Sequence, residues 1–246
     1  MSLSLPDRRR APALHLASEI VLLHGSEHDL PHGSKLYALA GGQQPACRLD
    51  VVYSVGQGLG DKPLLSWLLS QLLGEGTRQK SADAWHLALE STGAYMHRSF
   101  SGDLLQLSFY FLEAQCSAVL PLIREALFES DFPQHELDLL VHNQKATLAQ
   151  QAQKVAWQAG KKAKSLFFEG HAYGWLLTEE QLAPGFKRAA LKDWYQQELL
   201  ALRPSFYFSG GFSPDTLKSL HASLAEWPLG QKEAKPLVRP GTYKPG

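Results

Sequence analysis

Hydrophobic residues recur with two different periods along this chain, and the change from one to the other predicts the secondary structure. Alternating or continuous short apolar runs indicate strands at residues 19–23, 35–39, 48–55, 94–100, 104–112 and 206–209. Apolar residues at every third or fourth position indicate helices at about 63–73, 81–91, 115–128, 132–168, 187–200 and 213–226. The order lacks the regular strand–helix alternation of a doubly wound sheet. It predicts an α+β fold, with an antiparallel-rich sheet of about five or six strands backed by helices.

Turn and cap residues refine the element boundaries. Ser101-Gly102-Asp103 predicts a hairpin between two of the strands. Ser81 is a predicted N-cap of its helix. Pro121 is placed in the first turn of its helix, because proline breaks a helix interior. Gly160 is expected to divide the long stretch 132–168 into two helices.

The composition is that of an ordinary globular protein, with 246 residues, 44% hydrophobic residues and 20% charged residues. One domain is predicted over residues 18–228, between a flexible N-terminal arm, 1–17, and a Pro-, Gly- and Lys-rich connector, 229–246. The net charge is zero, so no overall field attracts nucleic acid or anionic lipid. No apolar run reaches the roughly 18 residues of a membrane span. Neither nucleic acid nor a membrane is therefore expected as a partner.

The two cysteines, Cys47 and Cys116, fit neither a disulfide framework nor a paired-cysteine metal site, and we interpret both as packing thiols. The first residues lack the apolar segment of a secretory signal. The compartment stays open: cytoplasmic for the sequence as given, or periplasmic if Met1-Ser2-Leu3 replaces a removed leader.

Three histidines at four-residue spacing, His24, His28 and His32, are a candidate metal site. On a helix they would lie on one face and could bind zinc or nickel. Gly25 and Pro31 oppose a helix here. The preferred interpretation is therefore a set of exposed turn histidines.

Three further candidates carry weaker signals. Residues 56–60, GQGLG, follow a strand and precede a helix but lack the spacing of a phosphate-binding loop, so we interpret them as a turn. Ser70 lacks the GxSxG elbow of serine hydrolases and is expected to bond its own helix backbone. His171 and Tyr173 lie in an aromatic stretch that either packs as a loop, the favoured interpretation, or lines a groove.

Residues 64–77, LLSWLLSQLLGEGT, form an apolar helical pattern that stops at Gly74 and continues into Gly76-Thr77. This segment resembles the helix that carries His-x-x-Glu-His and ends in Gly-Thr in inverzincin peptidases of the M16 (pitrilysin/insulinase) family. Other segments between about residue 18 and residue 226 resemble the family in the same order. They are 29–37 (DLPHGSKLY), 48–56, 91–94 (STGA), Phe132-Pro133, 171–174 (HAYG) and 191–211. The resemblance implies an M16 metallopeptidase-like (LuxS/MPP-like) domain.

The same resemblance implies that the catalytic residues are missing. The two zinc-binding histidines of the motif fall on Trp67 and Gln71, and its general-base glutamate falls on Ser70. The third ligand of the family, a glutamate on the long helix, falls near Ala146 and Thr147, and no Glu occurs from residue 137 to residue 168. Catalytic zinc needs about three protein ligands. No zinc, no other cofactor and no peptidase activity are therefore expected.

The function implied is that of a catalytically inactive M16 peptidase-like protein, a non-catalytic partner of an active zinc peptidase that helps bind extended peptides. M16 proteins normally contain two such domains in tandem, so an active M16 subunit or a second M16 domain is the expected partner. Residues 229–246 would then be a linker toward that missing second domain. Two alternatives stay open: a structural subunit of an assembly, and an M16 peptidase with a displaced metal site.

Without a metal that requires a polar pocket, the apolar side chains of this helix are expected to be buried. They are Trp67, Leu68, Leu72 and Leu73. Trp67→Ala would then cost a few kcal/mol as a large-to-small change in a core.

Overall fold

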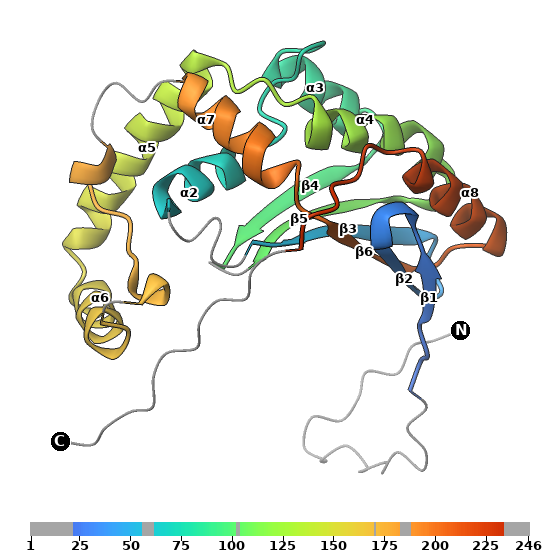
Figure 1. The fold of residues 1–246 in the computed structure, drawn as a ribbon, viewed down its shortest axis with the longest axis horizontal. Coiled ribbons are helices and arrows are strands. Elements are labelled where there is room, and N and C mark those ends of the chain that lie inside the picture. The colour runs from blue at the N-terminus through green and yellow to red at the C-terminus, as the bar shows by residue number, and fades with distance from the viewer. Residues whose placement is uncertain (1–21, 56–61, 102–103, 170, 183–187, 234–246) are drawn as a thin grey trace, which may run out of the picture.

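The computed structural model describes residues 22–55, 62–101, 104–169, 171–182 and 188–233. In these ranges six strands form one mixed sheet, and seven α-helices accompany it, most of them on one of its faces (Figure 1). The predicted α+β class and the antiparallel-rich sheet of five or six strands are confirmed.

The strands come from both halves of the chain. They are β1 (Ser26–Asp29), β2 (Lys35–Ala40), β3 (Ala46–Ser54), β4 (Tyr95–Phe100), β5 (Leu104–Leu112) and β6 (Pro204–Gly210). Their order across the sheet is β1-β2-β6-β3-β5-β4. Every neighbouring pair is antiparallel except β2 and β6. β6 thus joins the two halves of the sheet, and β1 and β4 are its edges.

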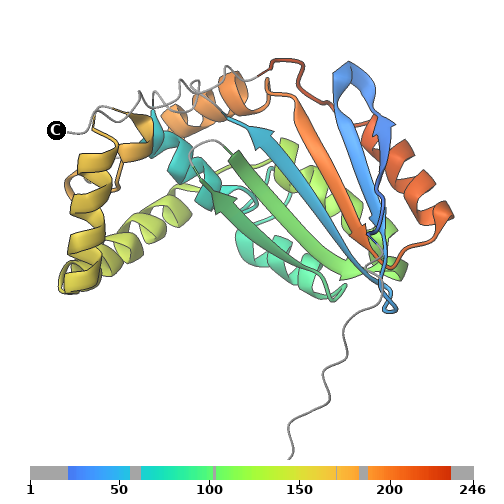
Figure 2. The same cartoon turned by 90° about the horizontal axis from the view of Figure 1, so that it is seen from below.

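The side-chain alternation of β3 shows how the two faces of the sheet differ. Leu49, Val51 and Tyr53 are buried against the helices. Arg48 and Asp50, at the alternate positions, point to the opposite face and form an ion pair of 2.8 Å. Figure 2 shows this second face, over which no described helix lies. We call it the open face.

The helices form a layer over the other face. They are α2 (Pro63–Leu72), α3 (Ala82–Glu90), α4 (Cys116–Phe128), α5 (Gln134–Ala152), α6 (Val155–Phe167), α7 (Arg188–Trp194), followed by a π-helical turn (Tyr195–Leu199), and α8 (Pro214–Ala225). α2, α3, α4, α7 and α8 lie over the sheet, whereas α5 and α6 extend away from it at one side of the molecule (Figures 1 and 2). Across the described ranges, no helix combines the length and apolar character needed to cross a bilayer.

Two helix details differ from the sequence prediction. Pro121 lies inside α4 rather than in its first turn, because the helix already begins at Cys116. Pro121 and Ser117 are both exposed, so water can bond the Ser117 carbonyl that loses its helical partner. The break between α5 and α6 falls at Gln153 and Lys154, where Lys154 is extended, and Gly160 lies within α6.

The first strand also differs from the prediction. Residues 19–21 lie outside the described ranges, and Leu22 and Leu23 are exposed and outside any strand. The strand is Ser26–Asp29, so the interpretation of His28 as a turn residue is wrong. β1 lacks an apolar sequence pattern because few of its side chains are buried. It pairs with β2, and the Lys35 ammonium of β2 bonds Glu27 and Asp29 of β1 at 2.7 and 2.6 Å.

The packed structure continues past residue 228. Leu229 is buried, and the backbone of Lys232 exchanges hydrogen bonds with Ala201 and Arg203, each 2.9 Å long. Leu229 and the backbone of Lys232 are therefore held against the domain, while the side chains of Gln231, Lys232 and Glu233 are exposed. The arm 1–17 and the rest of the linker, 234–246, lie outside the described residues.

Candidate functional site

α2 is an apolar helix that ends in a tight turn beside the start of α5. Leu68 and Leu72 are buried in the core. Gly74 and Gly76 follow with φ of 81° and 86°, which favours glycine over any other residue. A Cβ on Gly76 would lie 2.8 Å from Pro133 Cγ, so the close approach to α5 also requires glycine.

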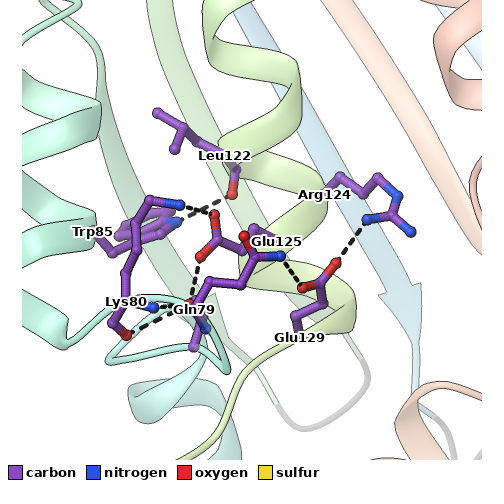
Figure 3. Close-up of polar contacts among 8 residues, drawn as sticks. Gln79, Lys80, Trp85, Leu122, Arg124, Glu125 and Glu129 are labelled. Carbon is purple, nitrogen blue, oxygen red and sulfur yellow. Dashed lines mark hydrogen bonds and ion pairs between the residues drawn. The ribbon is translucent and has the colours of Figure 1, made fainter.

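The turn after α2 is anchored to α4 by a buried carboxylate. Glu125 is only 6% exposed and accepts hydrogen bonds from Thr77 Oγ1 and Lys80 Nζ, both at 2.5 Å. Thr77 Oγ1 accepts the backbone N–H groups of Gln79 and Lys80 at 3.2 and 3.0 Å. Figure 3 shows Lys80 directed at Glu125, while the Gln79 side chain donates to Glu129 at 2.7 Å. The Gly-Thr sequence therefore fixes the position of α2, and every group in this network is engaged structurally.

Lys80 is expected to contribute strongly to stability because its ammonium neutralises a buried carboxylate. Lys80→Met should lower the free energy of unfolding by about 2 kcal/mol, measured by urea denaturation. Arg124→Met is the matched control. Arg124 lies on α4, the helix that also carries Glu125, and it pairs with Glu129 at 2.7 Å on the more exposed side of that helix. Its loss should cost less than about 1 kcal/mol. Equal losses would show that Glu125 does not depend on Lys80.

Trp67, Ser70 and Gln71 lie on one turn of α2. Ser70 Oγ is fully buried and donates to the Trp67 carbonyl at 2.7 Å, as expected for a hydroxyl bonded to its own helix. Gln71 Nε2 donates to Ser70 Oγ at 3.2 Å. An indole N–H can only donate, and a hydroxyl engaged in this way is not a base. These three side chains do not fit a zinc ion and its activated water.

The predicted burial of this helix is correct for three of the four residues. Leu68, Leu72 and Leu73 are at most 2% exposed. Trp67 is only half-buried, which corrects the prediction for that residue. Trp67 packs against the edge of the core and also lines a cavity that it shares with α5 side chains.

Ala146 and Thr147, the predicted region of the third ligand, do not lie beside Trp67. Both are exposed, and Thr147 Oγ1 donates to the Asn143 carbonyl at 3.0 Å. The α5 side chains that share a cavity with Trp67 include Gln144 and Leu148. Thr147 and the buried Leu148 are neighbours in sequence but lie on different faces of α5, because each helical residue rotates by about 100°. In the part of the chain that the structure describes, no three His, Cys, Asp or Glu side chains gather as a metal site.

A cavity of about 480 Å³ lies between α2, α5, α6 and the end of β4. We call it the aromatic pocket. Six aromatic side chains line it: Trp67, Phe100, Trp157, Phe168, Tyr173 and Trp175. The groove interpretation of the segment around His171 is therefore correct for Tyr173, whose backbone N–H bonds His171 Nδ1 at 3.1 Å. Phe168 and Trp175 belong to the same aromatic stretch, whereas sequence reasoning missed Trp157, which lies earlier in the chain on α6 and joins them only in the folded structure.

β4 is the edge of the sheet next to this pocket. Among the described strands it pairs only with β5, so one side of its backbone has no strand partner. Tyr95, His97 and Ser99 are exposed, and the strand ends at Phe100 and Ser101 in the pocket wall. An open strand edge of this kind can pair with an extended peptide.

The remaining candidates do not form a site. His28 lies in β1, where its Nε2 and Ser26 Oγ are 2.8 Å apart, and His32 has a left-handed φ of 61°. His24 precedes β1 in an extended segment, and the three imidazoles do not form a metal-binding group. The glycine-rich segment 56–60 lies outside the described residues.

Cys47 and Cys116 are packing thiols, as predicted. Both are buried and unbridged. Burial raises the pKa of each thiol to about 11, so both are protonated and unreactive at neutral pH.

Known structures share this fold. No protein-family model matches the chain, and no curated protein is a significant match. An M16 peptidase inactive domain from Pseudomonas fluorescens matches with a TM-score of 0.79 and 20% identity, over 89% of this chain and 54% of that one. A protease from Helicobacter pylori matches with a TM-score of 0.71 and 15% identity, over 92% of this chain and 55% of that one. A conserved protein from Enterococcus faecalis matches with a TM-score of 0.68 and 16% identity, over 86% and 54%.

These matches cover nearly all of this chain but only about half of each solved structure. The six-stranded sheet and its helices thus have the fold of M16 peptidase domains, including one described as inactive.

Proposed function

We propose that this chain is a non-catalytic M16 peptidase-like domain that pairs with a second M16 domain or subunit and helps hold extended peptides. The observation that carries the proposal is the composition of α2. The resemblance of residues 64–77 to the family's motif helix puts Trp67 and Gln71 at its two zinc-ligand positions and Ser70 at its general-base position. With a donor-only indole and an engaged hydroxyl at these positions, nothing on α2 activates water.

The open face supports pairing with another domain. Two exposed aromatic side chains lie on it: Tyr95 stacks on the half-buried Tyr110 at 4.6 Å, and Tyr207 stacks on the half-buried Tyr37 at 5.1 Å. The Arg48 guanidinium lies 5.3 Å from the centre of the Tyr110 ring. Tyrosine and arginine are enriched in protein interfaces. The matched structures are about twice as long as the matched region, which is consistent with a second domain in those chains.

The free edge of β4 supports the peptide-holding part of the proposal. Backbone pairing along an edge gives affinity with little dependence on sequence, which suits a subunit that presents peptides for cleavage elsewhere. Two alternatives make different demands. A structural subunit would use the open face and leave β4 without a ligand, and a displaced metal site would need ligands outside the described residues. A neighbouring gene for an M16 protein with an intact His-x-x-Glu-His would favour the peptidase-partner role over the structural one.

A peptide with alternate N-methyl groups tests edge pairing. In a strand, successive N–H groups point to opposite sides, so only one alternating set can bond β4. Methylating that set should weaken binding on the order of tenfold or more, since each lost hydrogen bond costs about 0.5–1.5 kcal/mol. Methylating the intervening set is the matched control and should leave the affinity close to that of the parent peptide. Isothermal titration calorimetry with the 246-residue chain measures the affinities of the parent peptide and of the two methylated peptides.

Equal binding by both methylated peptides would rule out strand pairing. Absence of binding by the parent peptide would leave the structural role as the better account.

A further inference from the structure

α6 carries an apolar surface that no described part of the chain covers. None of the residues of this helix is buried. At about 100° per residue, six of its apolar side chains fall within about 120° of the helix circumference. They are Val155, Ala156, Ala159, Ala163, Leu166 and Phe167, and all six are exposed. We call this surface the outer face of α6. A Cβ on Gly160, at its border, would meet no atom within 4 Å.

The other side of α6 is attached to the molecule. Trp157 and Phe168 line the aromatic pocket, and Lys164 Nζ donates to the Trp175 carbonyl at 3.2 Å. The helix is therefore held through one side, and its outer face is open although the helix itself is docked. A helix that is apolar all round is normally buried all round. An apolar surface left in the open instead indicates an interaction site.

The charge along α5 and α6 is positive. The net charge of the whole chain is zero, which predicts no membrane partner, but this charge is unevenly distributed. From residue 139 to residue 168 the chain has five lysines and neither Asp nor Glu. A basic helix with an apolar face is typical of segments that lie on anionic lipid surfaces.

Two of these lysines are available to a ligand of the outer face. Lys154 and Lys162 are exposed, and Lys162 lies about 20° around the helix from Val155, at the edge of the outer face. Lys161 is on the pocket side, where its ammonium lies 5.2 Å from the centre of the Trp157 ring. The outer face therefore combines apolar side chains with a cationic border.

The shape of this region fits a flat surface. α5 and α6 extend away from the sheet, with α6 at the far end of the projection (Figures 1 and 2). Alanines at the centre of the outer face and larger apolar residues at its ends give a smooth surface rather than a recess for one side chain. A nucleic acid would engage the lysines and leave the apolar residues in water, whereas a lipid surface engages both.

We propose that the outer face of α6 binds an anionic lipid surface. Leu166 and Phe167 enter the boundary between headgroups and acyl chains, and Lys154 and Lys162 lie against the lipid phosphates. The binding is peripheral, because the 13 residues of α6 are too few to span a bilayer. It uses neither β4 nor the open face, so it stands or falls independently of the peptide-holding function.

Sedimentation with lipid vesicles tests the proposal. The 246-residue chain should sediment with vesicles of phosphatidylcholine mixed with phosphatidylglycerol, and it should stay in solution with vesicles of phosphatidylcholine alone. Raising the salt to about 1 M shortens the Debye length to about 3 Å and should release most of the bound chain. Equal sedimentation with the two kinds of vesicle, or with neither, would overturn the proposal.

A double variant on α6 locates the binding surface. Lys162→Glu combined with Leu166→Ser should lower the vesicle partition coefficient on the order of tenfold or more, because both the charge and the apolar contact are lost. Lys218→Glu combined with Leu87→Ser is the matched control. Lys218 is exposed on α8, and Leu87 is 69% exposed on α3, against 64% for Leu166. The control should bind vesicles like the unmodified chain.

Circular dichroism establishes that both double variants are folded. Equal weakening by the two would show that α6 is not the lipid-binding surface. Self-association of the unmodified chain in analytical ultracentrifugation, abolished by the α6 variant and accompanied by no vesicle binding, would show that a second copy covers the outer face and would refute the lipid assignment. Peptide affinity in the calorimetric titration should be unchanged in the α6 variant, so the two proposals are tested separately.

Discussion

Restoring the three motif residues on α2 is expected to give only weak zinc binding, and a fourth substitution at Leu148 is expected to make it tight. Trp67→His, Ser70→Glu and Gln71→His supply two ligands and the base, but catalytic zinc needs about three protein ligands. Leu148 is 8% exposed and shares the aromatic pocket with Trp67. Adding Leu148→Glu should raise zinc affinity on the order of 100-fold or more, since even a lost outer-shell partner costs about 10–100-fold.

The neighbouring residue on α5 provides the control. Thr147→Glu in place of Leu148→Glu adds the same charge to the same helix, but on its exposed side. The zinc affinity of each four-residue variant is measured from its zinc content after dialysis and from competition with a chelator. Circular dichroism verifies that both variants are folded. Equal zinc affinity for the two would show that α5 does not face α2 as described.

Trp85→Ala is expected to lower the free energy of unfolding by about 3–5 kcal/mol, among the largest effects of any single substitution here. Trp85 is fully buried in α3, and its indole N–H donates to the Leu122 carbonyl at 3.2 Å (Figure 3). The truncation therefore leaves a cavity between α3 and α4 and removes the indole hydrogen bond to the Leu122 carbonyl.

Trp67→Ala also removes an indole side chain, but from a half-buried position. Its expected loss is about 1–2 kcal/mol, because much of the indole area already faces the aromatic pocket. Urea denaturation of both variants measures the difference. A Trp67→Ala loss as large as that of Trp85→Ala would mean that Trp67 is a core residue, as the sequence first indicated.

The parts of the fold that the sequence predicted well are those with strong local signals. β3 and β5 alternate apolar and polar residues and pair in register from Ala46 with Leu112 to Ser54 with Leu104. Ser81 and Ser213 cap α3 and α8 through their side chains, as expected from their types. β1 was misplaced because its polar residues become a strand only by pairing with β2. The break between α5 and α6 carries neither glycine nor proline, so no local signal marks it.

The candidate site also combines features with a local sequence signal and features without one. The sequence located α2 and its Gly-Thr end, because these lie on one short continuous segment. It did not locate the aromatic pocket, whose walls come from α2, β4, α5, α6 and a loop. The predicted third-ligand region, Ala146 and Thr147, is exposed, whereas the α5 residues that share the pocket with Trp67 include Gln144 and Leu148. Such convergence depends on helix rotation and packing, which no single segment encodes.

Mass spectrometry of the peptide recovered from the titration described above tests the central claim most directly. The chain should bind an extended peptide and release it intact, with or without added zinc, because α2 carries neither zinc ligands nor a base. Cleavage products that disappear with a chelator, return with zinc and are lost on mutation of a histidine of this chain would contradict the account.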